Sequence, residues 1–142
     1  MIIVTGGAGF IGSNLVQALE ARGDRDIVVC DILGHDDKWK NIAKRELADI
    51  IPPDDLPAFL GDNAKDIETV FHMGAVSATT ERDADLIVRS NIRLSLDLWD
   101  WCADSETPLI YASSAATYGD GERGFRDDDS IDGLANLRPM NA

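Results

Sequence analysis

Two patterns of apolar residues alternate along this chain. Short, uninterrupted apolar runs occur at Ile2–Val4, Ile27–Cys30 and Leu109–Ala112, and longer stretches between them repeat apolar residues at helical spacing. Uninterrupted runs of this length are typical of strands that are buried on both faces of a parallel sheet. Helices that follow such strands cover the two faces, so the pattern predicts an α/β fold.

A glycine-rich turn joins the first predicted strand to the first predicted helix. Its glycines are spaced Gly6-x-x-Gly9-x-x-Gly12, one residue longer in the first interval than the usual dinucleotide fingerprint. We expect Gly6 to adopt a backbone conformation closed to other residues and Gly9 to leave room for a pyrophosphate. Gly12 should let the helix lie close to the strand, and the first N–H groups of the helix should face the phosphates.

An acidic residue stands where a dinucleotide site requires one. Asp31 directly follows the second strand and lies 19 residues beyond Gly12, where a carboxylate can accept hydrogen bonds from an adenosine ribose. The alternative is a tight turn between strand and helix that binds nothing. The strand before the turn, the helix after it and Asp31 together favour the dinucleotide site.

The remaining elements continue the alternation of strands and helices. Thr80–Asp83 has the loose form of a capping box and should open the longest helix, over about 81–103, while Gly61 should end a short helix over 54–60. The other predicted elements are strands at 47–51, 67–72 and 108–112 and a short helix near 131–136. Their order favours a Rossmann-type doubly wound parallel sheet, truncated to about five strands in the order 3-2-1-4-5.

One polar residue interrupts the apolar stripe of the longest helix. The residues of that stripe are Ile87, Asn91, Leu94, Leu98 and Cys102. A polar amide on a buried helix face needs partners. We expect Asn91 to find them in the backbone of loops 74–77 and 113–115, lining a cofactor cleft. The alternative is a core asparagine that caps a neighbouring strand.

Composition narrows the class of protein. The chain has 142 residues, 44% of them hydrophobic, which suits one globular domain. No apolar run approaches the roughly 20 residues of a membrane span, and the first residues are themselves a core strand, so we expect a cytoplasmic protein without a signal peptide. Cys30 and Cys102 have no metal-binding or redox spacing, so both are predicted to be reduced structural thiols and no metal is expected.

The net charge of −13 argues against a nucleic-acid partner. Residues 1–45 carry six Lys/Arg and six Asp/Glu, whereas residues 46–142 carry seven and twenty. A basic cluster, Lys38–Arg45, follows Asp31 closely. It is either a solvated loop or a partner for a phosphate near the expected ribose.

Three segments of this sequence carry a resemblance to a known family. Thr5–Gly12, His72–Ala75 and Tyr111–Gly119 resemble the corresponding motifs of extended short-chain dehydrogenases/reductases of the nucleotide-sugar epimerase type, and the match runs the whole length. Segments 36–41 and 77–81 narrow it further within that type. The resemblance implies a cofactor, NADP with NAD possible, that accepts a hydride from a nucleotide sugar and returns it to the opposite face. It also implies a homo-oligomeric full-length protein.

The resemblance implies roles for individual residues. Ser114 would hydrogen-bond the reacting oxygen, with Ser113 as the nearby competitor. Ser77, Thr79 and Thr80 would contact the substrate. The implied cofactor site consists of Gly6, Gly9, Phe10, Ile11, Gly12, Asp31, Ile32, Lys38, Met73, Gly74, Ala75, Val76, Ser77 and Asn91.

The sequence departs from the family in one large respect. The family's proton-transferring tyrosine is followed four residues later by a lysine, and no Tyr-x-x-x-Lys occurs in these 142 residues. Tyr111 is inside a strand, and Tyr118 is followed by Glu122. We therefore expect an N-terminal fragment with one incomplete NAD(P)-binding domain over 1–142 and no substrate-binding domain. The alternatives are a fragment of another UDP- or dTDP-sugar epimerase or dehydratase, and a non-catalytic NAD(P)-sensing module.

The last predicted strand should lie at the edge of the sheet. In a complete fold of this type its free edge is covered by a strand that comes later in the sequence. Leu109–Ala112 is apolar and uncharged, so we expect self-association through this edge.

Overall fold

The structure is a computed structural model that describes residues 1–35, 37–78 and 80–140. It divides into two compact units, Met1–Tyr111 and Ala112–Ala142. The first unit contains the whole sheet. The second contains a short 3-10 helix, η4 (Ala115–Tyr118), and the helix α5 (Ile131–Ala135). Within the described residues, no helix is long and apolar enough to cross a membrane.

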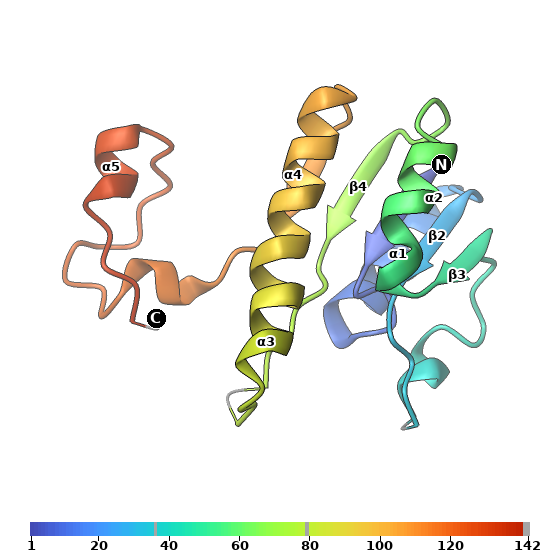
Figure 1. Cartoon of the computed structure of the whole chain (residues 1–142), viewed down its shortest axis with the longest axis horizontal. Coiled ribbons are helices and arrows are strands. Elements are labelled where there is room, and N and C mark those ends of the chain that lie inside the picture. Colours follow the sequence, from blue (N-terminus) through green and yellow to red (C-terminus); the bar gives the residue numbers. More distant parts are fainter. Residues whose placement is uncertain (36, 79, 141–142) are drawn as a thin grey trace. The chain divides into compact units, whose positions relative to one another are not determined.

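The sheet of the first unit has five strands in the order β3-β2-β1-β4-β5, as the sequence predicts (Figure 1). The strands are β1 (Ile2–Thr5), β2 (Ile27–Cys30), β3 (Asp49–Ile51), β4 (Thr69–His72) and β5 (Leu109–Tyr111). All four pairings are parallel. The register aligns Thr5 with Cys30 on one side and with His72 on the other, so three strands end at the same level.

Helices cover both faces of the sheet. The longer helical elements are α1 (Phe10–Arg22), α2 (Leu56–Asp62) and the continuous run α3 (Ala84–Ile87), η3 (Val88–Arg93) and α4 (Leu94–Asp104). Two short 3-10 helices, η1 (Asp37–Asn41) and η2 (Pro53–Asp55), lie in the connections. Along β1, Ile2 and Val4 pack in the cluster beneath α1, whereas Ile3 packs in the cluster beneath α2 and α4. Both faces of the central strands are therefore buried, which explains their uninterrupted apolar runs.

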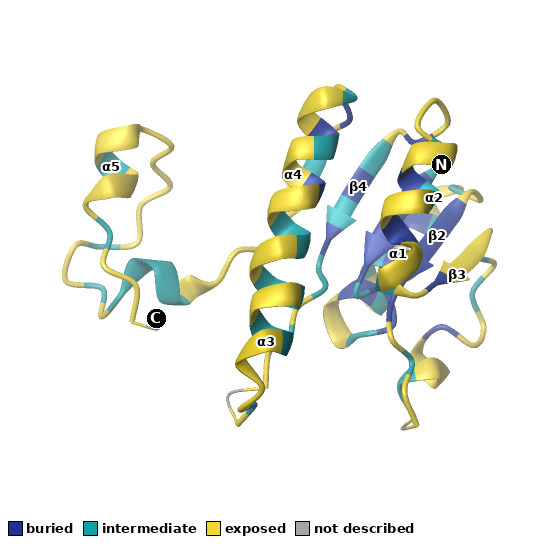
Figure 2. Cartoon of the chain, in the orientation of Figure 1, coloured by how far each residue is buried: buried dark blue, intermediate teal, exposed yellow. Residues whose placement is uncertain are grey.

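Figure 2 shows the same division by burial: β2 is buried along its length, while the outer surfaces of α2 and α4 are exposed. The predicted stripe of the long helix follows this division. Leu98 and Cys102 are buried, and Ile87, Asn91 and Leu94 are half-buried. The stripe prediction is therefore confirmed.

Two predicted helix boundaries are wrong. The long helix begins at Ala84 with Asp83 as its N-cap, whose carboxylate accepts from the backbone N–H of Leu86 at 3.0 Å. The predicted capping box at Thr80–Asp83 does not form, because the Glu81 carboxylate accepts from the N–H groups of Arg82 and Asp83 in a turn before the helix. Gly61 does not end its helix either. The space where a side chain would stand is open, and α2 continues to Asp62.

The long helix contains a π-helical segment that no sequence pattern indicates. Residues Val88–Arg93 form the wider turn, in which a carbonyl accepts from the N–H five residues later. Asn91 lies inside this segment and Ser95 lies just after it. π-Helical turns inside α-helices are frequent at functional sites.

Salt-promoted self-association through β5 is expected. Among the residues that the structure describes, β5 pairs with β4 alone, and Ile110 is 43% exposed. Charge repulsion at a net charge of −13 opposes association at low salt, and screening over about 10 Å at 0.1 M salt weakens it. Sedimentation at low and moderate salt should show dimers or larger species only at moderate salt, and Ile110→Lys should remove them.

The opposite edge of the sheet supplies the control for this experiment. Ile50 on β3 is also 43% exposed, but its strand starts with Asp49 and is followed by Pro52. Charges and prolines protect edge strands against pairing. Ile50→Lys should therefore leave the association unchanged. A sharp monomer at both salt concentrations would contradict the prediction.

Candidate functional site

A cavity of about 590 Å³ opens at the carboxyl ends of the central strands in the first unit, and we call it the edge cavity. In open α/β sheets, ligands bind at this edge. Residues from the glycine turn, the end of β2, the loop after β4 and the α3–α4 helix line it. The predicted cofactor residues in its lining are Gly6, Asp31, Ile32, Lys38, Met73, Gly74, Ala75 and Val76.

The glycine turn has the backbone geometry that the sequence predicts at Gly6 and Gly12. Gly6 has φ +64°, and a Cβ there would lie 2.6 Å from the Cα of Gly74. At Gly12, a Cβ would lie 2.2 Å from the carbonyl oxygen of Gly6. Gly12 thus lets the helix pack against the turn that leaves the strand. At Gly9, a Cβ would meet the same oxygen at 3.2 Å, which the backbone can nearly accommodate.

The first turn of α1 is open to an anion. Its N-cap is Gly9, which supplies no side-chain acceptor for the free N–H groups of the helix. The next two residues, Phe10 and Ile11, are exposed. Both belong to the predicted cofactor site, together with Gly9 and Gly12, but none of the four lines the edge cavity.

Asp31 ties the end of β2 to the glycine turn. Its Oδ2 accepts from the backbone N–H of Ala8 at 2.8 Å, and its Oδ1 accepts from the N–H of Ile32 at 2.7 Å and from Lys38 Nζ at 2.5 Å. The carboxylate is nearly buried, with 6% of its side chain exposed. It therefore faces the turn and the edge cavity, as its position in the sequence predicts.

Asn41 is a residue of this site that the sequence pattern missed. Its side-chain N–H group donates to the carbonyl oxygen of Ala8 at 2.8 Å. The backbone N–H of Ala8 is already bound by Asp31, so side chains hold both polar groups of this residue. A single asparagine in a polar loop carries no periodic signal that could have revealed this contact.

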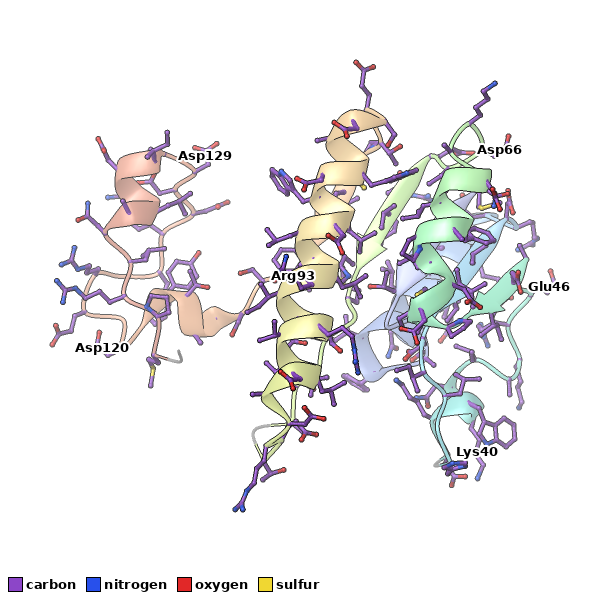
Figure 3. The ribbon with its side chains drawn as sticks, in the orientation of Figure 1. Lys40, Glu46, Asp66, Arg93, Asp120 and Asp129 are labelled. Carbon is purple, nitrogen blue, oxygen red and sulfur yellow. The ribbon has the colours of Figure 1, made fainter. Side chains whose placement is uncertain are left out.

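The predicted basic cluster does not act as one group. Lys38 lines the edge cavity beside Asp31. Lys40, on η1 (Figure 3), pairs with Asp37 at 2.8 Å, and Arg45 pairs with Glu20 on α1 at 2.6 Å. If this cluster includes a partner for a phosphate, that partner is therefore Lys38, because Lys40 and Arg45 pair with acidic side chains elsewhere.

The loop after β4 is fixed by Asn91. The Asn91 side-chain oxygen accepts from the N–H of Val76 at 2.8 Å, and its amide nitrogen donates to the carbonyl oxygen of Val76 at 3.0 Å. This confirms the expected partner in loop 74–77. Ser77 is the last residue of this loop and is exposed. A contact of Asn91 or of Ser77 with the cofactor stays a prediction.

The pKa values of two buried groups next to the edge cavity are shifted in the direction that favours the uncharged form. Burial, and to a smaller extent the neighbouring Asp31 carboxylate, raises the pKa of the Cys30 thiol to about 12. Burial lowers the pKa of His72, whose ring contacts the hydroxyls of Thr5 and Ser95. Cys30 and Cys102 are both buried free thiols, as predicted. No group of three or more His, Cys, Asp or Glu side chains in the described part of the chain could hold a metal ion.

Of the predicted substrate residues in the first unit, Ser77 and Thr80 do not line the edge cavity. Ser114 belongs to the second unit, where its hydroxyl accepts from the N–H of Ala116 at 3.2 Å and caps η4. Its neighbour Ser113 is exposed. Thr80 is exposed in the first unit, and Thr79 lies outside the described residues. Their roles stay predictions.

Comparison with known proteins gives a consistent result. Residues 2–142 match the NAD dependent epimerase/dehydratase family. The chain is 52% identical over 143 aligned positions to an ADP-L-glycero-D-manno-heptose-6-epimerase of Fusobacterium nucleatum, covering 99% of this chain and 43% of the relative. The chain thus spans less than half the length of this relative.

Solved structures show the same likeness. The Helicobacter pylori ADP-L-glycero-D-manno-heptose-6-epimerase matches with a TM-score of 0.71 and 30% identity, over 99% of this chain and 45% of that one. A UDP-glucuronic acid 4-epimerase of Bacillus cereus, in complex with UDP-glucuronic acid and NAD, matches with a TM-score of 0.70 and 28% identity, over 97% and 45%.

Proposed function

This chain belongs to the NAD dependent epimerase/dehydratase family, and we propose that its first unit binds an adenine dinucleotide in and beside the edge cavity. The observation that carries the proposal is the link between Asp31 and the glycine turn. One carboxylate binds the N–H of Ala8 and also faces the edge cavity, so the ribose and pyrophosphate positions are adjacent.

The residues present fit such a ligand. The uncapped first turn of α1 offers N–H groups to the pyrophosphate. An ionised carboxylate has about four acceptor positions, and three described groups occupy positions on Asp31, which leaves capacity for a ribose hydroxyl. The loop Met73–Val76 borders the opposite side of the same space. When bound, the nicotinamide ring would supply a hydride acceptor, which the chain's own side chains do not provide.

Fluorescence titration with a reduced dinucleotide tests this proposal. We expect saturable binding to the folded 142-residue chain, with a change in nicotinamide emission. Circular dichroism should confirm that the sample is folded. A folded sample that binds neither NADPH nor NADH would refute the dinucleotide site.

We favour NADP over NAD as the cofactor. A carboxylate at the ribose repels the 2′-phosphate that distinguishes NADP, but Lys38 is paired with Asp31 and places a positive charge there. Lys38→Ala should weaken NADPH binding about tenfold more than NADH binding, because a charge-assisted contact contributes about 1.5–3 kcal/mol. Competition titrations with the two cofactors measure the difference.

Lys40→Ala is the matched control for this comparison. Lys40 is two residues away on η1, pairs with Asp37 and is 56% exposed. It should leave both affinities near those of the unchanged chain. If Lys38→Ala lowers the affinities for NADPH and NADH equally, Lys38 does not contact the 2′-phosphate.

We propose that the chain is the cofactor-binding part of an ADP-L-glycero-D-manno-heptose 6-epimerase, which makes a precursor of the lipopolysaccharide inner core. Identities of 52% and 48%, each over 99% of the chain, to two ADP-L-glycero-D-manno-heptose-6-epimerases support this substrate. In this proposal Ser77, Thr79 and Thr80 contact the nucleotide sugar and Ser114 hydrogen-bonds its reacting oxygen. A cytoplasmic location and homo-oligomerisation belong to the same proposal.

Coding sequence that continues in frame to a Tyr-x-x-x-Lys supports the epimerase. A genuine stop after codon 142 favours a non-catalytic NAD(P)-sensing module, because that function needs no tyrosine.

A further inference from the structure

A buried row of hydrogen bonds crosses the first unit beneath the edge cavity. The Thr5 hydroxyl lies 2.6 Å from His72 Nδ1, and His72 Nε2 lies 2.9 Å from the Ser95 hydroxyl. Thr5 and His72 are each 1% exposed. The row therefore joins the end of β1, the end of β4 and the start of α4, and it is buried at Thr5 and His72 and half-buried at Ser95.

The two ends of this row fix the direction of every hydrogen bond. At one end the N–H of Gly74 donates to the Thr5 hydroxyl at 3.0 Å, and at the other the Ser95 hydroxyl donates to the carbonyl of Asn91 at 2.9 Å. The one hydroxyl proton of Ser95 is used in the bond to Asn91, so the Ser95 oxygen accepts a hydrogen bond from Nε2–H of His72. The Thr5 proton then goes to Nδ1. Within the described residues no buried side-chain nitrogen or oxygen lacks a partner, and this neutral arrangement uses every proton.

The surroundings of the ring favour the neutral form. Burial opposes a charged imidazolium. The ring of Tyr111 on β5 stacks on the imidazole, with centroids 5.5 Å apart and planes 20° apart. The polar contacts of the His72 ring in the described part of the chain are the two hydroxyls.

The row brackets the loop that borders the edge cavity. Its first end binds Gly74, and Asn91, whose carbonyl forms its last end, binds both backbone polar groups of Val76. The loop also touches the glycine turn, because a Cβ at Gly74 would lie 3.0 Å from the backbone nitrogen of Gly6. Any movement of the row therefore moves the wall of the proposed cofactor site.

We propose that His72, held as the Nε2–H tautomer by Thr5 and Ser95, is a positioning residue that fixes the Met73–Val76 loop against the glycine turn. The link to cofactor binding rests on the proposed dinucleotide site, whereas the order of the loop can be measured without a ligand. Because the groups involved come from residues 5, 72 and 95, the arrangement depends on the folded sheet.

Two variants remove opposite ends of the row, and each has a matched control. Ser95→Ala removes the acceptor of Nε2–H. Its control is Ser105→Ala, because Ser105 is also half-buried and donates to the carbonyl four residues earlier, that of Trp101, without contacting a histidine. Thr5→Val removes the hydroxyl at nearly constant volume. Its control is Thr5→Ser, which keeps the hydroxyl.

Three measurements test the proposal. Nitrogen-15 NMR of the unchanged chain should show the neutral Nε2–H tautomer of His72 at pH 7. Amide hydrogen exchange at Gly74 and Val76 should become about tenfold faster in Ser95→Ala and Thr5→Val. The dissociation constant for NADPH should rise about tenfold, which corresponds to about 1.4 kcal/mol. Ser105→Ala should leave all three unchanged, and Thr5→Ser should recover most of the loss.

The outcomes separate this proposal from the dinucleotide proposal. An Nδ1–H tautomer, an imidazolium, or unchanged exchange in Ser95→Ala would overturn the role of His72. If the unchanged chain binds the cofactor and Ser95→Ala binds it equally well, the positioning role in binding is also refuted. If the unchanged chain binds no dinucleotide but shows the expected tautomer and exchange pattern, the dinucleotide proposal fails and the loop-fixing role of His72 stands.

Discussion

Gly9→Val should raise the dissociation constant for NADPH at least about 100-fold, the equivalent of losing one or two charge-assisted hydrogen bonds to phosphate. Gly9 has φ −72° and ψ 177°, a conformation that valine adopts without strain. A Cβ there would lie 3.2 Å from the nearest atom, the carbonyl oxygen of Gly6, so the fold needs to yield only slightly. The added side chain would stand at the first turn of α1, where the pyrophosphate is expected to approach the main chain. Titration by nicotinamide fluorescence measures the loss.

Two other glycines serve as references. Gly61 in α2 has open space where a Cβ would stand, so Gly61→Val should bind NADPH like the unchanged chain. Gly12→Ala should lower the free energy of unfolding of the first unit, because its Cβ would lie 2.2 Å from the Gly6 oxygen. Urea unfolding separates the two kinds of effect. Unimpaired binding by folded Gly9→Val would place the pyrophosphate elsewhere.

The 142-residue chain should not epimerise ADP-heptose at any pH. General acid–base catalysis contributes about 10²–10⁴-fold to such rates, and orientation of the substrate contributes more. We expect neither tyrosine to supply the base. The Tyr111 ring stacks on the buried His72, and Tyr118 is followed four residues later by Glu122 instead of a lysine. Proton NMR of the sugar, with NADP present, measures conversion.

The same preparation must first pass the cofactor titration, so that inactivity does not reflect unfolded protein. Turnover by the pure 142-residue chain would overturn the assignment of the base to residues outside it. Such turnover should then be tested in Ser114→Ala, since Ser114 is the residue that the resemblance places at the reacting oxygen.

The sequence predicts the strands because local signals govern them, and the alternation of strands with helices predicts their order. The run Ile27–Cys30 matches β2 residue for residue, since each of its side chains is buried on one face or the other. The positive φ of Gly6 and the position of Asp31 follow from the glycine spacing and the end of β2. The run of β2, the conformation of Gly6 and the place of Asp31 at the end of its strand each depend on residues that are near one another in the chain.

The features that the sequence does not predict depend on distant residues or on competing local bonds. Thr5 and His72 are 67 residues apart, and Asn41 and Ala8 are 33 apart, so no periodicity could reveal either contact. The long helix starts later than the sequence predicts because Glu81 forms a turn with its own neighbours before Asp83 caps the helix. Nothing in residues Val88–Arg93 distinguishes a π-helical turn from an α-helical one.

The bonds on both sides of Ala8 have a thermodynamic meaning. This residue is fully buried, and Asp31 and Asn41 hold its two polar groups before any ligand arrives. The conformational entropy that a flexible phosphate loop would lose on binding has therefore already been lost on folding. Calorimetry of cofactor binding should accordingly report a heat-capacity change set by the apolar area that the cofactor covers, without the larger change that accompanies ordering of a disordered segment. A preorganised turn of this kind discriminates between ligands by shape, because it cannot rearrange to fit a poor one.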